Sequence, residues 1–405
     1  MVMHPPVHRA RPKASEAPHP AELRGANLDR VFAAALERDG SFTRAELIAE
    51  TGLSAPTIGS LATDLIRLDL LHDLGPGPSR GGRRPSLMEF NARYGFAAGV
   101  DIGPTRTRLA VADLRDRQLA NRVVSTPTAL APREMLQQIA CDLRKLMHET
   151  GVPADRLLAV GAGAPGIVNE HTGVVAVAPN LEGWHDVPMR EILQEAFNAP
   201  VFVENDVNLA MLGEHWRGAA RGHDTCAFIL VGTGIGAAVL IDGQLHRGHH
   251  FMAGEIGFMC MGPQFVNIDF GEHGCLETIA GLHALAERVP NLVEQDPDGW
   301  ISTLSEAAGR GEPEARAALL EIARLIGIAV ANVTVVVDPS LIVLGGALFM
   351  QAPRLVEAVS SVAQSISRAP IPVVLSALDK EAPLWGGLLV ALTAARERVR
   401  QELRS

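Results

Sequence analysis

A glycine-rich turn separates two apolar runs in CAFILVGTGIGAAVLIDGQL, residues 226–245. Earlier in the chain, FAAGVDIGPTRTRLAVADL, residues 96–114, has the same layout of strand, tight turn and strand. This repetition predicts an internal duplication, with two related lobes that face each other across a cleft. Backbone N–H groups of both turns would then be available to a phosphate chain. Alternatively, both segments are tight hairpins in which glycine serves only the backbone.

The bulk composition is that of an ordinary soluble globular protein. Of the 405 residues, 47% are hydrophobic and 20% are charged, so we expect two or three domains. The N-terminus lacks the apolar segment of a signal peptide, and the apolar stretch 226–241 is too short and too rich in glycine to span a bilayer. Four widely spaced cysteines do not make a disulfide framework. We therefore expect a cytoplasmic protein with reduced thiols and no membrane partner.

The charge is distributed unevenly along the chain. The formal net charge is -10, yet residues 1–90 carry 11 basic and 11 acidic side chains, and the other 315 residues carry 25 and 35. A neutral N-terminal module can approach a polyanion, whereas the acidic remainder would be repelled by it. Within the module, the Pro- and His-rich residues 1–20 are typical of a disordered tail.

Residues 26–67 have the pattern of a helix-turn-helix. Apolar side chains at helical spacing predict a first helix from Ala26. TRAE, residues 43–46, fits a capping box that starts a short second helix. In TGLSAP, Gly52 supplies a turn, Ser54 an N-cap and Pro56 the first turn of a third helix. The second helix of such a pair enters the DNA major groove, and its outward residues here are small and polar.

The following segment, LLHDLGPGPSRGGRRPSLMEF, residues 70–90, predicts a two-stranded wing with a basic tip. We expect DNA to contact the start of the third helix and this tip. Alternatively, residues 26–90 form a three-helix protein-interaction module with a solvated arginine cluster. The candidate DNA-binding residues are Ser54, Ala55, Thr57, Ser60, Arg80, Arg83 and Arg84.

Polar residues follow a strand in VFVENDVNLAMLGEH, residues 201–215. Glu204, Asn205 and Asp206 end the strand and run into a helix, at the edge of the sheet where open α/β sheets bind ligands. Asp206 could deprotonate a sugar hydroxyl, or Asn205 or Asp206 could merely cap the helix. Glu255 and Glu277 add two carboxylates after glycines. Such a set of planar groups binds polyols, because each can hold neighbouring hydroxyls in pairs.

The order and spacing of several motifs resemble the ROK family of repressors and sugar kinases. They include VDIGPT, GAPG, APNLEGW, ENDVNLAMLGE, the long segment 231–257, GEHGCLET and DPSLIVLGGAL. The N-terminal module, joined through GGRRP, is similar to the repressor branch, which includes xylose-responsive and N-acetylglucosamine-responsive regulators; the kinases lack it. The resemblance implies a winged helix-turn-helix followed by an α/β, two-lobed, actin-like (ribonuclease H-like) sugar-kinase fold. The implied domains are residues 21–92, then a first lobe of 93–206 with 383–405, and a second lobe of 207–382.

The resemblance also implies roles for individual positions. Asp206 would be the base of a kinase. The nucleotide would meet both glycine-bearing turns and a glycine pair near adenosine. The implied sugar-binding residues are Gly166, Asn180, Asn205, Asp206, Glu255 and Glu277. The implied nucleotide-binding residues are Gly103, Thr105, Gly232, Thr233, Gly234, Gly345 and Gly346.

Two departures from the family pattern shape the expected function. Pro104 replaces a glycine of the first phosphate turn, which removes an N–H donor and fixes φ, so phosphoryl transfer should be impaired. The histidine and three cysteines of the family's zinc loop align here with Phe258, Ile268, Phe270 and Cys275. We therefore expect no zinc or other cofactor, with apolar packing in place of the metal. A site made of Cys260, His273 and Cys275 is the alternative.

The hypothesis that follows is a sugar-responsive transcriptional regulator, acting as a repressor rather than as an enzyme. A homodimer or tetramer would bind double-stranded operator DNA through the winged helices and a small carbohydrate in the cleft between the lobes. The first alternative is an ATP-dependent hexose or N-acetylhexosamine kinase with an accessory DNA-binding domain. The second is a ligand-independent repressor whose pocket is vestigial.

Overall fold

The computed structural model describes residues 20–77, 84–368 and 371–404, and the chain divides into two compact units. The first unit comprises the N-terminal part through Ala92 together with Glu397–Ser405. The second unit is Arg93–Arg396. Of the tail predicted at residues 1–20, residues 1–19 lie outside the described chain, whereas Pro20 begins a helix.

The first unit combines a helical layer with a three-stranded sheet. Strand β3 lies between β1 and β2 and is antiparallel to both. The β2–β3 hairpin forms the predicted wing; Arg80 and Arg83 fall outside the described residues, and Arg84 lies two residues before the start of β3. The elements are α1 (Pro20–Glu37), β1 (Ser41–Thr43), α2 (Arg44–Thr51), α3 (Ala55–Arg67), β2 (Leu71–Pro76) and β3 (Ser86–Phe90).

Local sequence signals fix both ends of α2 and the start of α3, as predicted. Thr43 Oγ1 accepts a hydrogen bond from the Glu46 N–H (3.3 Å), and Glu46 Oε2 accepts one from the Thr43 N–H (2.7 Å), which completes the capping box. Gly52 ends α2 at φ 67°. Ser54 then caps α3 by accepting from the Thr57 N–H at 3.3 Å. Each of these interactions joins residues at most four apart, so they do not require the rest of the fold.

The last two turns of the C-terminal helix α14 (Ala382–Arg404) belong to the first unit. The prediction that placed all of 383–405 in the first lobe is therefore wrong for 397–405. Arg400 Nε lies 3.0 Å from Asp29 Oδ1 on α1, and Arg404 pairs with the other oxygen of the same carboxylate. A Cβ on Gly25 would lie 3.0 Å from the Arg404 Cα, so the two helices approach closely there.

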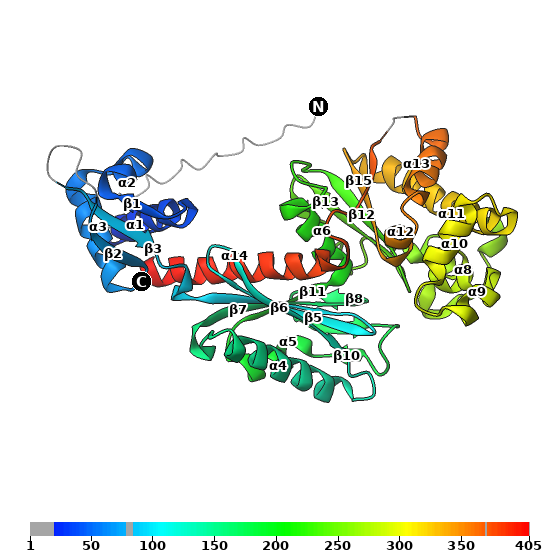
Figure 1. Cartoon of the computed structure of the whole chain (residues 1–405), viewed down its shortest axis with the longest axis horizontal. Coiled ribbons are helices and arrows are strands. Elements are labelled where there is room, and N and C mark those ends of the chain that lie inside the picture. The colour runs from blue at the N-terminus through cyan, green and yellow to red at the C-terminus, as the bar shows by residue number, and fades with distance from the viewer. Residues whose placement is uncertain (1–19, 78–83, 369–370, 405) are drawn as a thin grey trace, which may run out of the picture. The chain divides into compact units, whose positions relative to one another are not determined.

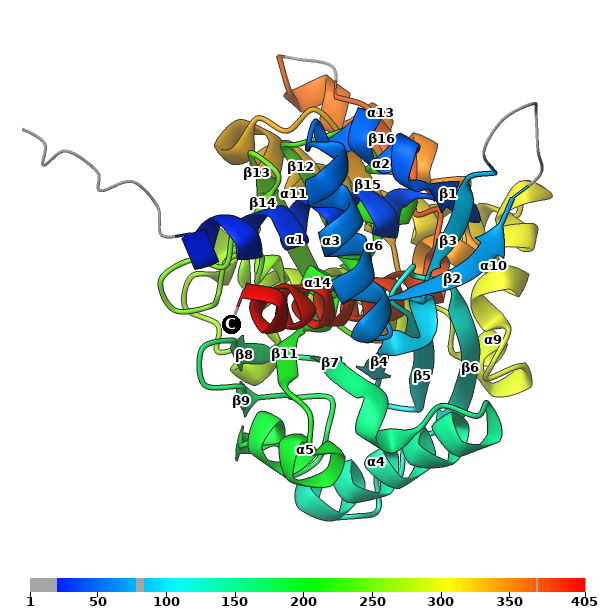
Figure 2. The ribbon, with the colours of Figure 1, turned by 90° about the vertical axis from the view of Figure 1, so that its left-hand side faces the viewer.

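The first lobe of the second unit is built on a five-stranded sheet in the order β11-β7-β4-β5-β6. Helices α4 and α5 cover one face of this sheet, and the first part of α14 covers the other (Figures 1 and 2). A small antiparallel sheet, β10-β9-β8, completes the lobe. The elements are β4 (Phe96–Ile102), β5 (Arg106–Asp113), β6 (Gln118–Ser125), α4 (Pro132–Glu149), β7 (Leu157–Ala164), β8 (Ile167–Asn169), β9 (Val174–Val177), β10 (His185–Val187), α5 (Met189–Phe197) and β11 (Val201–Asn205).

The second lobe is built on another five-stranded sheet, in the order β14-β13-β12-β15-β16. Helix α6 packs on one face, and the apolar side chains of α10, α11, α12 and α13 pack on the other. The elements are α6 (Asp206–Arg217), β12 (Cys226–Val231), β13 (Ile235–Ile241), β14 (Gln244–Leu245), α7 (Cys275–Ala280), α8 (Leu282–Arg288), α9 (Pro290–Gln295), α10 (Trp300–Gly309), α11 (Pro313–Val337), β15 (Ile342–Gly345), α12 (Ala347–Gln351), α13 (Leu355–Ile366) and β16 (Val373–Leu375).

The two large sheets have the same topology, which confirms the predicted duplication. In each, the first strand pairs antiparallel with the second and parallel with the fourth: β4 with β5 and β7, and β12 with β13 and β15. The third strand extends the hairpin, and the fifth lies outside the fourth. Each lobe is therefore one copy of a doubly covered α/β unit.

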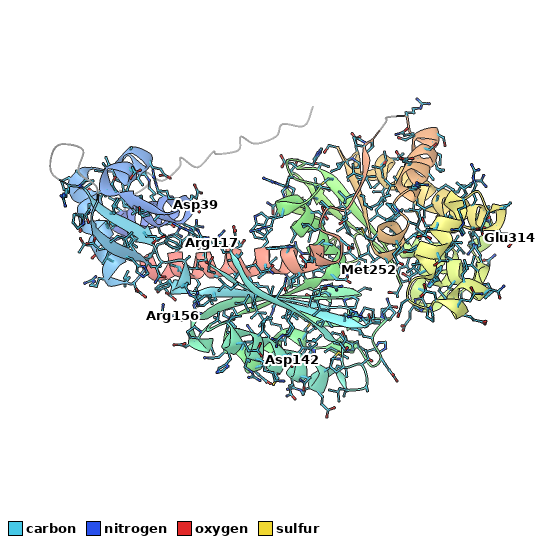
Figure 3. All side chains as sticks on the ribbon, viewed as in Figure 1. Asp39, Arg117, Asp142, Arg156, Met252 and Glu314 are labelled. Atoms are coloured by element: carbon cyan, nitrogen blue, oxygen red, sulfur yellow. The ribbon has the colours of Figure 1, made fainter. Side chains whose placement is uncertain are left out.

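Among the described helices, α11 is the one that is both long and apolar enough to be compared with a membrane span. Its 25 residues have a mean hydropathy of 1.9 over the most apolar window, so by length and composition it could cross a membrane. Half of that window is buried inside the protein, where Ile322, Ile326 and Val330 contribute to the core of the second lobe. Polar side chains lie on the outside of both lobes, for example Asp142 on α4 and Glu314 at the start of α11 (Figure 3). The role of α11 in this structure is that of a core helix.

Replacing Thr43 with Ala should loosen the start of α2. The change removes one capping hydrogen bond and the hydroxyl that contacts Glu46, so we expect local opening to become easier by about 1 kcal/mol. Hydrogen–deuterium exchange of the α2 amides should then be roughly fivefold faster. Thr63→Ala is the control, because the Thr63 hydroxyl bonds only to its own helix at Gly59 O. Equal exchange in wild type and Thr43→Ala would show that the box does not hold α2.

Candidate functional site

A cavity of about 260 Å³ lies between the two lobes of the second unit. The segments that line it come from the carboxyl ends of first-lobe strands and from the turn and loops of the second lobe. This is the edge at which open α/β sheets bind ligands. Six residues that the sequence predicted for a sugar site all line this one cavity: Gly166, Asn180, Asn205, Asp206, Glu255 and Glu277.

On the first-lobe side, Asn205 performs two tasks. Its Nδ2 donates to Gly166 O at 2.9 Å, and its Oδ1 accepts from the Asn208 N–H at 3.0 Å and so caps α6. Gly166 has φ +84°, and a Cβ there would lie 2.0 Å from Val177 O. Only glycine fits at this position. The capping role that competed with a binding role in the sequence is therefore real, and Asn205 lines the cavity as well.

On the second-lobe side, Glu277 ties the glycine-rich turn to the start of α7. Its Oε2 accepts from the Ile235 N–H at 2.7 Å, just after the turn, and its Oε1 lies 2.8 Å from His273 Nδ1. Gly234 is close to this carboxylate, since a Cβ there would lie 2.9 Å from Glu277 Oε2. The turn between β12 and β13 is thus held by a carboxylate of the cavity.

Two carboxyl groups of the cavity, those of Asp206 and Glu255, have raised pKa values. Burial raises the pKa of Asp206 to about 6. Burial, with repulsion from Asp206 and Glu277, raises the pKa of Glu255 to about 7. Glu272 also lines the cavity, and none of the described lining residues is Lys or Arg. Such groups can donate as well as accept hydrogen bonds near neutral pH, which suits hydroxyl groups.

Sequence reasoning missed the apolar wall of the cavity and one carboxylate. Pro104, Phe258 and Glu272 lie in segments that the sequence singled out, but not for binding a sugar, and the lining residues meet only because the fold brings distant segments together. A weak signal was available for Pro104, which the sequence marked for a different reason. The missed lining residues include Pro104, Ile167, Val177, Phe258 and Glu272.

A second cavity, of about 150 Å³, shares Asp206 with the first. Gly103 and Gly346, two of the predicted nucleotide-binding residues, line it, whereas Thr233 and Gly234 line the first cavity. Thr105, Gly232 and Gly345 are not among the described residues that line either cavity.

Two of the charged groups that line the second cavity pair with each other, whereas Lys380 lines it without an ion pair to any described residue. Arg108 Nη1 lies 3.3 Å from Asp101 Oδ2. Burial raises the pKa of Asp101 to about 7, with a further contribution from Asp206 and an opposing one from Arg108. One backbone donor of each turn is also engaged: the Gly103 N–H donates to Arg106 O at 3.1 Å, and the Gly232 N–H donates to Gly234 O at 2.9 Å.

The residues at the family's zinc positions do not fit a zinc site. Phe258, Ile268 and Phe270 offer no ligand atom, and Cys275 is buried at the start of α7. The expected apolar packing is wrong for Phe258 and Ile268, which are 45% and 50% exposed; Phe270 packs against Phe265 with ring centroids 6.0 Å apart.

The alternative metal site is not assembled in the described chain. His273 pairs with Glu277, and the Cys260 thiol donates to Gly262 O. No group of three possible metal-ligating side chains occurs among the residues that the structure describes.

The candidate DNA-binding face of the first unit is the start of α3. Ser54, Ala55 and Ser60 are exposed, and Thr57 is half-buried with its hydroxyl 2.8 Å from Ser54 Oγ. Ile58, Leu61 and Leu65 point into the core instead. The predicted outward residues thus share one accessible end of the helix, while Arg84 lies at the base of the wing.

Replacing Glu255 with Gln should stabilise the protein more at alkaline than at acidic pH. The pKa of Glu255 is raised from 4.5 to about 7 in the folded chain, so its ionisation costs stability as the pH rises through this window. We expect thermal or urea unfolding to show a gain of up to about 3 kcal/mol at pH 8 and little gain near pH 4.5. Glu314→Gln, on an exposed residue, controls for loss of one charge. An equal gain at both pH values would contradict the burial of a protonated Glu255.

Comparisons with known proteins agree with this architecture. Residues 97–394 match the ROK family. A xylose repressor of Caldicellulosiruptor bescii is 30% identical over 77% of this chain and 82% of the repressor. A glucokinase of Streptomyces coelicolor is 34% identical over 63% of this chain and 82% of the kinase. A solved ROK family transcriptional regulator, homologous to the MLC protein of Escherichia coli, has a TM-score of 0.75 and 22% identity over 95% of this chain and 99% of its own. The chain belongs to the ROK family.

Proposed function

We propose that this protein is a transcriptional regulator that binds operator DNA through its first unit and a small sugar in the cavity of its second unit. The observation that carries the proposal is the presence of both parts in one chain. A helix-turn-helix presents small polar residues at an exposed helix start, and a separate cavity gathers carboxyl and amide groups. The relative named xylose repressor supports the pairing of these two tasks, because it is similar over 77% of this chain.

The chemistry of the cavity favours an uncharged monosaccharide. Asp206, Glu255, Glu272 and Glu277 all face it, without a described cationic residue in its lining. A phosphate or carboxylate on the ligand would meet like charges in a poorly solvated space and would be repelled. The volume of about 260 Å³ is just below the range typical of drug-sized ligands. Xylose and glucose are the first sugars to test, because one relative is named xylose repressor and another glucokinase.

Sugar phosphorylation is the competing function, and the 34% identity to a glucokinase favours it. Asp206 lies between the two cavities, where a base could take a hydroxyl proton. Against it, Pro104 lacks an N–H, and the Gly103 and Gly232 donors are used inside the protein. In addition, Arg108 is already paired with Asp101. Positioning of phosphates dominates phosphoryl transfer, so we propose that the chain senses its sugar without metal or nucleotide chemistry.

The proposed regulator acts in the cytoplasm as a dimer or tetramer. Two winged helices bound to two half-sites give the spacing dependence that a sugar can alter. A sugar shifts DNA affinity only to the extent that it binds one conformation of the protein better than the other.

Sugar binding should depend on Asp206 and on the absence of charge in the ligand. By isothermal titration with xylose and glucose, we expect Asp206→Ala to raise Kd at least tenfold, because it removes a charged partner of a hydroxyl. The corresponding sugar phosphates should bind at least tenfold more weakly than the free sugars. Glu314→Gln should leave every Kd unchanged.

Enzyme activity would overturn the sensing proposal. In a coupled assay with ATP, we expect neither xylose nor glucose to be phosphorylated at the rates usual for enzymes, which are about 1 s⁻¹ or more. Turnover at such rates that is abolished by Asp206→Asn would establish the kinase alternative instead.

A negative charge at the start of α3 should weaken DNA binding selectively. Ser60→Glu places a carboxylate on the exposed face proposed to meet phosphates and base edges. We expect operator affinity, measured by fluorescence anisotropy at fixed salt, to fall at least tenfold while sugar affinity stays constant. Ser361→Glu adds the same charge at an exposed position of α13 and should change neither. Equal losses for both variants would mean that α3 does not contact DNA.

A further inference from the structure

Three separate segments of the second unit meet beside the cavity, and each supplies residues to its lining. The first is β8 with the turn after it; Gly166 precedes this strand, and Ile167 begins it. The second is the end of β11, which leads into Asn205 and Asp206. The third is the loop after β14, which leads to Glu255. The first two belong to the first lobe and the third to the second lobe.

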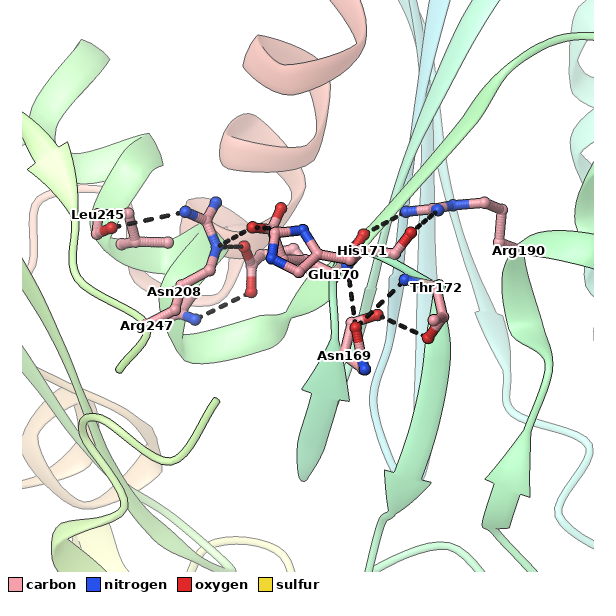
Figure 4. A network of polar contacts seen from close by, with 9 residues as sticks. Asn169, Glu170, His171, Thr172, Arg190, Asn208, Leu245 and Arg247 are labelled. Carbon is pink, nitrogen blue, oxygen red and sulfur yellow. Dashed lines mark hydrogen bonds and ion pairs between the residues drawn. The ribbon is translucent and has the colours of Figure 1, made fainter. Parts of the chain in front are cut away.

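The side chain of Arg247 joins these three segments (Figure 4). Its Nε donates to Glu204 Oε2 on β11 at 2.7 Å and lies 3.7 Å from Glu170 Oε1 in the turn after β8. Its Nη1 lies 3.5 Å from Leu245 O, at the end of β14 in the same lobe. One guanidinium group of the second lobe therefore contacts two carboxylates of the first.

Glu204 is a demanding partner because its charge is buried. Its side chain is 7% exposed, and its other oxygen accepts from the Asn205 N–H and from Asn208 Nδ2, each at 2.9 Å. Without Arg247, this buried carboxylate would keep its two neutral donors on one oxygen but would have no positive charge beside the other. The Arg247–Glu204 pair thus holds the residue that directly precedes Asn205 and Asp206.

The main chain of Arg247 closes the loop that carries Glu255, so the side chain is attached to a defined part of that loop. The Arg247 carbonyl oxygen accepts from the Ala253 N–H at 3.1 Å, which closes the loop on itself, and the Ala237 N–H donates to Gly254 O at 2.7 Å. A Cβ on Gly254 would lie 2.0 Å from Ala237 O, so this end of the loop lies against β13. Met252, at the exposed part of the loop, is labelled in Figure 3.

We propose that Arg247 is a positioning residue that locks the two lobes together around the bound sugar. This inference rests on the proposed sugar-binding function and adds a determinant of affinity that does not touch the ligand, because Arg247 is outside the lining of the cavity. The pair acts through Asn205 and Asp206 on one side and Glu255 on the other. His171, in the turn after β8, makes a second contact with the same loop, because its ring lies edge-on to that of Phe251 with centroids 5.4 Å apart. This contact carries no charge and leaves Glu204 untouched, whereas Arg190 donates to His171 O within the first lobe.

Titration with xylose and glucose tests the proposal on the full chain. We expect Arg247→Ala to raise Kd at least tenfold, mainly through faster sugar release, and Arg247→Lys to recover part of the loss. Arg288→Ala is the matched control, since Arg288 pairs with Glu321 inside the second lobe. It should change Kd less than twofold. Unchanged binding by Arg247→Ala would overturn the proposal.

A double variant separates positioning from simple charge neutralisation. In Arg247→Ala/Glu204→Gln the buried carboxylate is gone, so the melting temperature of the ligand-free protein should return toward that of wild type. The link between the lobes is still absent, so Kd should stay raised. If Kd recovers together with the melting temperature, Arg247 has only a structural role and the proposal is wrong.

Hydrogen–deuterium exchange of the ligand-free protein distinguishes failure of this inference from failure of the proposed function. Arg247→Ala should accelerate exchange both in the loop 246–255 and in the turn 169–172, which belong to different lobes. Acceleration of exchange in the loop alone would overturn the proposed lock. If wild type binds no sugar yet Arg247→Ala shows the expected acceleration in both segments, the proposed function fails and the link between the lobes stands.

Discussion

Helix α6 and the start of α14 are held in place by direct contact of backbone with backbone. These contacts occur at glycines, which have no side chain to keep the main chains apart. A Cβ on Gly386 would lie 1.9 Å from Leu209 O, one on Gly213 2.2 Å from Ala382 O, and one on Gly161 2.1 Å from Gly387 O. No side chain can occupy such spaces, so α6, α14 and β7 approach as closely as their main chains allow. The far end of α6 is anchored as well: Glu214 is fully buried and accepts from Ser376 Oγ and from the Leu378 and Ala219 N–H groups. Helix α6 is therefore rigidly placed, and its first residue is Asp206.

That placement creates an electrostatic conflict at the cavity. As the first residue of α6, Asp206 lies where the helix dipole stabilises a negative charge, typically by about 0.3–1 kcal/mol. This is a small fraction of the free energy that burying a charge costs. Burial nevertheless raises its pKa from 3.8 to about 6, a change worth about 3 kcal/mol, so desolvation outweighs the dipole. Glu255 responds in the same way. Carboxyl groups kept partly protonated in this way can bind neutral hydroxyls in either direction, and they make an anionic ligand unfavourable.

The features that were predictable from the sequence were those with local causes or a repeated pattern. The Thr43–Glu46 capping box and the Ser54 N-cap depend on neighbours within four residues, and the structure has both. The duplication was visible because each lobe begins with the same strand, turn and strand. The polar residues at the end of β11 were identifiable from their position after an apolar run. Distant contacts left no such trace: the Arg247–Glu204 pair spans 43 residues, and the pairing of Arg404 with Asp29 spans 375. Phe258 and Ile268 were expected to be buried because they are apolar, but their loop leaves them half exposed.

The difference between a kinase and a sensor on this fold lies in how the second cavity uses its charges. A phosphate chain needs free backbone donors and cations that are not already paired. Here Arg108 pairs with Asp101, Pro104 has no N–H, and the turn donors at Gly103 and Gly232 bond within the protein, so among the described lining residues Lys380 is left as the cation of this cavity that could meet a phosphate. The first cavity gathers all six residues that were predicted to bind a sugar. Binding energy from a sugar would then have no reaction to accelerate, and it would be available for the conformational equilibrium of the lobes, where a regulator needs it.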